Sequence, residues 1–167
     1  MFRTIDEFVA TWQHESSSTQ KILDALTDAS LQQPVSPEDR TLGRIAWHIV
    51  TTLHEMLSRT GLIFEAVEDE SGVPAGAKEI ADSYRKASQA LVAAMREQWT
   101  DASLLETKDM YGEQWPIHTT LSILVAHQTH HRGQITVLMR QAGLRVPGVY
   151  GPSREEWSEF GMTAPTI

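Results

Sequence analysis

Residues 119–144 read TTLSILVAHQTHHRGQITVLMRQAGL and carry the main signals for the fold of this chain. Their periodicity predicts a helix, and one face of it carries Leu124, His127, His131, Ile135 and Leu138. That face should point into an apolar core, yet two imidazoles interrupt it. His127 and His131 lie one turn apart, so both rings can reach a single point in space. This spacing suits a metal ion that takes neutral nitrogen ligands.

A pair of histidines is weak evidence by itself, because the same spacing occurs in hydrogen-bonded core pairs and by accident on helix flanks. An imidazole without a partner costs about 1–3 kcal/mol to bury, which favours a ligand role for a pair on the apolar face. Because a site of two histidines is weak, a third ligand should exist elsewhere in the chain. The stretch from Thr41, a plausible N-cap, to about Val67 predicts a second helix. One face of that helix carries Ile45, His48, Thr52, Met56 and Ile63. His48 is therefore the third candidate ligand.

The remaining polar residues near these helices are predicted to play smaller roles. His54 lies about 120° around the helix from His48 and is interpreted as a surface residue. His118 is interpreted as structural. His130 could donate a hydrogen bond to a ligand or face solvent, and Gln134 could face the site or be an exposed helix residue. Glu15 is a further candidate for the surroundings of the site.

The first helix is predicted over residues 4–28, with a polar gap at Glu15, Ser16 and Thr19 in its apolar face. The run Ser16–Thr19 has low helix propensity, which favours a break or simple exposure over a face that lines a wet cavity. Residues 33–40, with Pro34 and Pro37, form a loop.

A third helix is predicted from about Ala77 to Trp99, and residues 100–117 could hold a short irregular hairpin. The fourth helix is expected to begin at a Thr119 cap and to end at Gly143. Ser153-Arg154-Glu155-Glu156 predicts a short tail helix anchored by Trp157 and Phe160. Four amphipathic helices predict a single all-α domain, a four-helix bundle spanning residues 1–167.

Composition excludes several classes of protein. The chain has 167 residues, of which 41% are hydrophobic, with five tryptophans and a formal net charge of −8. Because no basic stripe is present, neither nucleic acid nor an anionic membrane is an expected partner. The N-terminus predicts neither a signal peptide nor a membrane span, so we expect a cytoplasmic protein. There is no cysteine, so any metal must use His, Asp or Glu.

Residues His127 to His131 resemble the HExxH motif of zinc peptidases, with Gln128 in place of the glutamate. In those peptidases the carboxylate is the general base, and an amide cannot accept the proton. A zinc peptidase of this type is therefore not expected.

Several segments resemble the DinB/YfiT-like superfamily of metalloenzymes. They are His127-x-x-x-His131-Arg132-Gly133-Gln134, the stretch LGRIAWH that ends at His48, the tail VPGVYGP (146–152), and Glu156-Trp157. The resemblance implies an up-down-down-up four-helix bundle with a long crossover, here residues 68–76. It implies a divalent metal, nickel or zinc, bound by His48, His127 and His131, and it implies a homodimer. Some relatives are S-transferases or isomerases that use bacillithiol, mycothiol or glutathione.

Three functions remain open from the sequence. The first is a metal-dependent transferase that presents a small thiol to an electrophilic small-molecule substrate, with Gln134 and Glu15 around the ligands. The second is a metal-dependent hydrolase that uses metal-bound hydroxide. The third is a non-enzymatic bundle that stores a stress-related ligand or metal.

Overall fold

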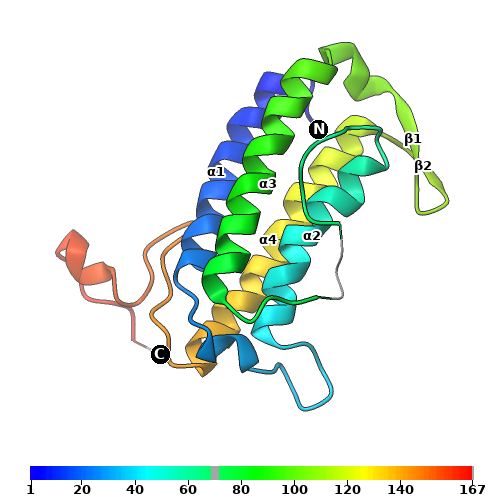
Figure 1. Cartoon of the computed structure of the whole chain (residues 1–167). Helices are drawn as coiled ribbons and strands as arrows, with labels where there is room; N and C mark the ends of the chain where they lie inside the picture. The colour runs from blue at the N-terminus through cyan, green and yellow to red at the C-terminus, as the bar shows by residue number, and fades with distance from the viewer. Residues whose placement is uncertain (69–71, 167) are drawn as a thin grey trace.

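Four stretches of helical periodicity form the four long helices of the computed structural model, which describes residues 1–68 and 72–166 (Figure 1). These helices are α1 (Ile5–Asp24), α2 (Leu42–Ser58), α3 (Ala77–Gln98) and α4 (Ile117–Gln141). α1 and α4 run in one direction and α2 and α3 in the other, which is the predicted up-down-down-up bundle. Because α2 and α3 are parallel, their connection returns along the length of the bundle. The predicted crossover, residues 68–76, includes residues 69–71, which lie outside the described part.

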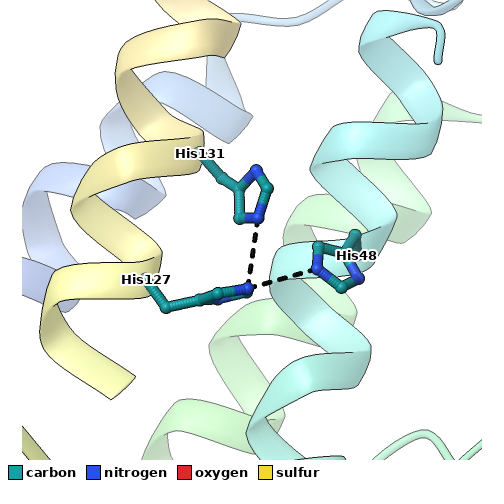
Figure 2. Close-up of side chains that lie close together, drawn as sticks. All are labelled: His48, His127 and His131. Atoms are coloured by element: carbon teal, nitrogen blue, oxygen red, sulfur yellow. Dashed lines mark hydrogen bonds between the residues drawn. The ribbon is translucent and has the colours of Figure 1, made fainter. Parts of the chain in front are cut away.

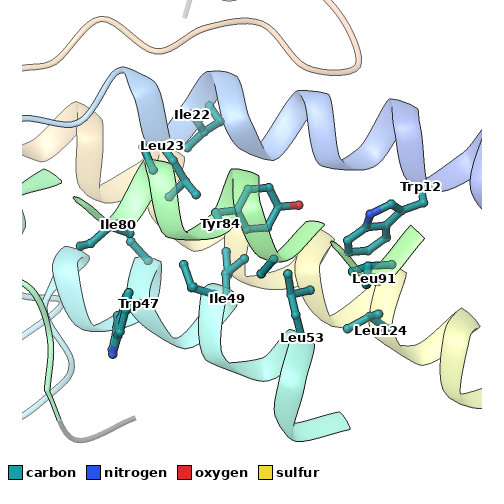
Figure 3. Close-up of a cluster of buried hydrophobic side chains, with 14 of the residues drawn as sticks. Trp12, Ile22, Leu23, Trp47, Ile49, Leu53, Ile80, Tyr84, Leu91 and Leu124 are labelled. Atoms are coloured by element: carbon teal, nitrogen blue, oxygen red, sulfur yellow. The ribbon is translucent and has the colours of Figure 1, made fainter. Parts of the chain in front are cut away.

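Each helix packs against two others. α2 contacts α3 and α4, and α1 also contacts α3 and α4, so α1 and α2 lie diagonally across the bundle. Figure 3 shows the apolar side chains that fill the centre. The largest that are almost completely buried include Trp12, Ile22, Leu23, Ile49, Leu53, Ile80, Tyr84 and Leu91. No helix of the described residues is both long and apolar enough to cross a membrane.

α1 is continuous, so the break or exposure predicted at residues 16–19 is wrong. Thr4 caps the helix by accepting a hydrogen bond from the amide of Glu7 at 3.1 Å. Glu15, Ser18 and Thr19 are buried rather than exposed. Tertiary contacts across the bundle, described below, outweigh the low helix propensity of the serines.

α2 begins where the sequence predicts, with Thr41 accepting from the amide of Arg44 at 3.2 Å, but it ends at Ser58 rather than near Val67. Gly61 has a φ of +87°, and its left-handed backbone turns the chain away from the helix. Ile63, predicted to face inward, is consequently 80% exposed.

α4 begins three residues earlier than predicted, at Ile117, so Thr119 is inside the helix and is not its cap. The amide of Ile117 donates to the carbonyl of Glu106 at 2.9 Å, which makes a side-chain cap unnecessary at this point. At the other end the prediction is confirmed. Gly143 has a φ of +76°, and the amide of Leu144 turns back to the carbonyl of Met139 at 2.9 Å.

The predicted hairpin is confirmed between α3 and α4. Strands β1 (Thr107–Met110) and β2 (Glu113–Pro116) pair antiparallel around Tyr111 and Gly112, which both have positive φ. Short 3-10 helices lie at Ala29–Gln32, Asp101–Leu105 and Trp157–Phe160. The last is the predicted tail helix, but Phe160 is 65% exposed and does not anchor it.

The core predicts the outcome of one substitution. Leu53 on α2 is 1% exposed, whereas Leu105 is 72% exposed. Leu53→Ala should lower the free energy of unfolding of the metal-free protein by about 2–5 kcal/mol, because it leaves a cavity. Leu105→Ala, the matched control, should change it by less than about 0.5 kcal/mol. Urea unfolding followed by circular dichroism measures both, and equal effects would show that the core is wrongly assigned.

Candidate metal centre

Three imidazoles converge between α2 and α4 (Figure 2). His48 extends from α2, and His127 and His131 extend from successive turns of α4. Nε2 of His127 lies 3.3 Å from Nε2 of His48 and 3.1 Å from Nε2 of His131. One ligand atom from each of the three rings lies within 4.8 Å of the others. The structure therefore brings together the three histidines that the sequence singled out.

Two of the separations between these nitrogens suit ligands that share one ion. Metal–imidazole bonds are about 2.0–2.1 Å long, so two nitrogens on one ion are about 3.3–3.4 Å apart at a tetrahedral angle and about 2.9 Å apart at a right angle. The distances of 3.3 Å and 3.1 Å lie within this range. Three neutral imidazoles with a further position open is the donor set of catalytic rather than structural zinc.

Neighbouring oxygens fix which ring nitrogen is available. Nδ1 of His131 donates to Oε1 of Gln134 at 2.7 Å, so in the neutral ring Nε2 keeps its lone pair. Thr52 donates its hydroxyl proton to the carbonyl of His48 at 2.6 Å. Its oxygen lies 3.5 Å from Nδ1 of His48 and is left as an acceptor there. Both arrangements direct Nε2 toward the point where the rings meet.

Burial keeps the rings neutral. Burial, and then the nearby rings of His131 and His48, lower the pKa of His127 to about 4. Burial also lowers the pKa of His131, although the bond to Gln134 partly offsets this effect. At neutral pH these two imidazoles are therefore unprotonated, which is the form that a metal ion binds.

The other histidines of α2 and α4 lie outside this group. His130 is exposed, with its ring centroid 4.8 Å from that of His131. Nε2 of His54 lies 3.8 Å from a carboxylate oxygen of Glu68, and His118 contacts Thr119. Gln134, although exposed, makes the contact with His131 that the sequence left open.

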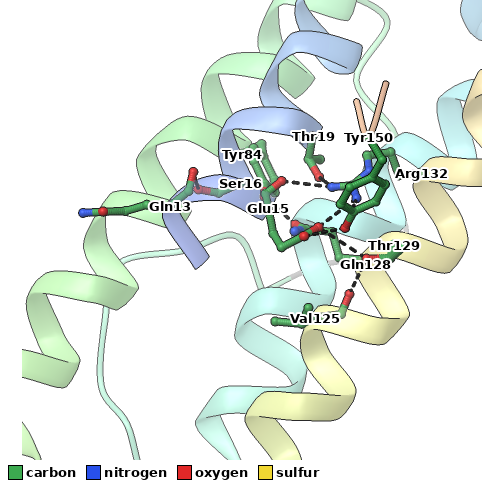
Figure 4. Close-up of polar contacts among 10 residues, drawn as sticks. All are labelled: Gln13, Glu15, Ser16, Thr19, Tyr84, Val125, Gln128, Thr129, Arg132 and Tyr150. Atoms are coloured by element: carbon green, nitrogen blue, oxygen red, sulfur yellow. Dashed lines mark hydrogen bonds and ion pairs between the residues drawn. The ribbon is translucent and has the colours of Figure 1, made fainter. Parts of the chain in front are cut away.

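Glu15 of α1 pairs with Arg132 of α4 rather than with the imidazoles (Figure 4). Nη2 of Arg132 donates to Oε2 of Glu15 at 2.8 Å, and the two residues are 3% and 5% exposed. The hydroxyl of Tyr150 donates to the other carboxylate oxygen and accepts from Arg132 at 3.1 Å. Burial alone would raise the pKa of Glu15, but the bonds from Tyr150 and Arg132 outweigh burial and lower it.

Gln128 also points away from the imidazoles. Its side chain is buried, and its Oε1 accepts a hydrogen bond from the hydroxyl of Tyr84 on α3. Gln128 therefore contacts α3 through Tyr84, and its amide oxygen is already engaged as an acceptor. The buried polar contacts of Arg132 and Tyr84 were not predicted from the sequence. The signal was present, since polar residues follow each α4 histidine and a polar gap interrupts α1.

The lowered pKa values predict how the metal-free protein responds to acid. His127 titrates near pH 4 when folded and near pH 6.5 when unfolded, so between these values the unfolded chain binds more protons. Stability should therefore fall as the pH drops from about 6.5 to 4. Thermal unfolding of His127→Gln should show a shallower fall over this window than the native protein, and parallel curves would contradict the assignment.

Comparison with known proteins gives two relatives of high identity. The uncharacterized protein YrdA of Bacillus subtilis (strain 168) is 51% identical over 167 residues, covering all of both chains. The crystal structure of a DinB-like protein from Bacillus cereus ATCC 10987 is 53% identical and superposes with a TM-score of 0.88. It covers 90% of this chain and 100% of the other.

More distant structures share the fold. YfiT of Bacillus subtilis is described as "a probable metal-dependent hydrolase with an unusual four-helix bundle topology". It is 17% identical with a TM-score of 0.64, covering 84% of this chain and 89% of its own. The profile of the DinB family matches residues 1–164. This match, nearly end to end and accompanied by relatives of more than 50% identity, shows that the chain belongs to the DinB family.

Proposed function

We propose that this chain is a metal-dependent enzyme that joins a small thiol to an electrophilic substrate, with a nickel or zinc ion held by His48, His127 and His131. The observation that carries the proposal is the separation of the three Nε2 atoms, 3.3 Å and 3.1 Å from the central one. Among the described residues, this group of metal-ligating side chains contains imidazoles and no carboxylate.

The donor set favours activation of a weak acid. Neutral imidazoles bring no negative charge, so an ion held by them would act with its full charge and would lower the pKa of a thiol or water in the open position. His127 and His48 are half-buried, whereas His131 is buried, so a small molecule would approach from the side of the first two.

The reaction balances without a protein nucleophile. The thiol loses its proton to solvent, its sulfur attacks an electrophilic carbon, a carbon–sulfur bond forms, and the leaving group departs with its electron pair. The chain contains no cysteine, so the sulfur would come from the cosubstrate. A low thiol pKa replaces the side-chain base that the described imidazole group does not contain.

A metal-dependent hydrolase is the second candidate, and the description of YfiT favours it. The same three imidazoles would then activate water instead of a thiol. The two candidates differ in one respect that is easily measured, because only the hydrolase turns over esters or amides when no thiol is present.

The ligand assignment predicts the effect of removing one histidine. His48→Ala should lose at least about 90% of the bound zinc or nickel after dialysis, since two imidazoles remain. His54→Ala, on the same helix but outside the group, should keep the native stoichiometry. Elemental analysis of the dialysed proteins measures both. Full retention of metal by His48→Ala would exclude this ligand set.

The thiol hypothesis predicts a spectroscopic change. Protein loaded with Co(II) should gain a sulfur-to-cobalt charge-transfer band in the near ultraviolet when glutathione or 2-mercaptoethanol is added. His131→Ala, treated in the same way, should not gain it. If no thiol changes the native spectrum while p-nitrophenyl esters are hydrolysed faster as the pH rises, the hydrolase replaces the transferase.

A further inference from the structure

We propose that Gln128 and Arg132 are positioning residues that fix the rotation of α4 about its own axis. Each directly follows one of the two α4 histidines of the metal centre, so the two pairs have the same spacing of four residues. Successive side chains on a helix diverge by about 100°, so Gln128 and Arg132 point away from the imidazoles. The inference rests on the metal centre proposed above.

Arg132 is attached to α1 by three directional contacts. Its Nη1 donates to the carbonyl of Glu15 at 3.0 Å and to the hydroxyl of Thr19 at 3.2 Å. Its Nη2 donates to the carboxylate of Glu15 at 2.8 Å. These groups are all buried, so water does not compete with them, and the contacts hold one fixed geometry.

Gln128 is attached to α3. Tyr84 is completely buried, and its hydroxyl donates to Oε1 of Gln128. The amide nitrogen of Gln128 is buried without a hydrogen-bond partner among the described residues. An unpartnered buried amide costs free energy, so stability alone does not explain a glutamine at this position. Its bond to Tyr84 nevertheless defines the direction of this turn of α4.

The tail adds a third attachment. The ring of Tyr150 lies with its centroid 5.3 Å from the guanidinium carbon of Arg132, and its hydroxyl binds both members of the ion pair. α4 is thus held by polar contacts with α1, with α3 and with the tail that follows its own C-terminus.

Apolar packing alone would not define the metal centre closely enough. Side-chain atoms lie about 5–6 Å from a helix axis, so a rotation of about 10° would move a ring nitrogen by about 1 Å. Metal–ligand distances tolerate only about 0.2 Å. Contacts between aliphatic side chains are not directional and permit small rotations, whereas the hydrogen bonds of Arg132 and Gln128 do not.

Two changes test this role. The double variant Glu15→Leu/Arg132→Met removes the ion pair without leaving a charge buried alone, and Tyr84→Phe removes a single hydroxyl. Zinc affinity would be measured at 10 °C by competition with a chelating dye, together with the visible spectrum of the Co(II) form. Both variants should bind zinc about 10–100-fold more weakly and show a shifted Co(II) spectrum.

The matched controls are Arg140→Met and Tyr111→Phe. Arg140 is also on α4, and its replacement breaks an ion pair with Glu155 of the tail. Tyr111→Phe removes the hydroxyl that binds Glu55. Both should keep native affinity and spectrum. Variants that lose only thermal stability, with native affinity and spectrum, would overturn the positioning role. If the double variant does not fold, Tyr84→Phe decides alone. Native protein that binds neither zinc nor nickel would instead refute the proposed function.

Discussion

The packing of α2 against α4 is the contact on which every functional feature of this chain depends. It brings His48 to His127 across 79 residues of sequence, to a distance of 3.3 Å. Burying three imidazoles between helices costs free energy unless their nitrogens have hydrogen-bond or metal partners. Here Gln134 and Thr52 contact the Nδ1 atoms of His131 and His48, and Nε2 of His127 lies 3.1 Å from Nε2 of His131 and 3.3 Å from Nε2 of His48. The bundle is also large enough to fold around its apolar core without a metal.

α4 carries different chemistry on two sides. One face carries the imidazoles, with burial lowering the pKa of His127, and another face carries Arg132, which pairs with Glu15 of α1. Removing one partner of such a pair typically costs about 3–5 kcal/mol, although replacing both by apolar residues is often neutral. A buried ion pair therefore adds little stability by itself. Its value here is directional, because it holds α4 in the orientation that aims its histidines.

Most of the fold could be predicted from local signals, which are the apolar spacing, the Thr41 cap and the Gly143 terminator. The same spacing placed His48, His127 and His131 on inward faces. The predictions were wrong where contacts with residues distant in the sequence determine the local structure. Glu15 and Thr19 look like a break in α1 until Arg132 is seen to bind them. The start of α4 depends on a carbonyl of Glu106, and no local pattern reveals that contact.

The proposed metal centre requires one divalent ion bound by the three imidazoles. X-ray absorption on zinc-loaded protein, compared with His127→Gln, detects this ion and its ligands. The native protein should contain one zinc per chain with about three imidazole nitrogens at about 2.0–2.1 Å, and the variant should lose this shell. A native spectrum with oxygen ligands alone, or a shell unchanged by removing His127, would contradict it.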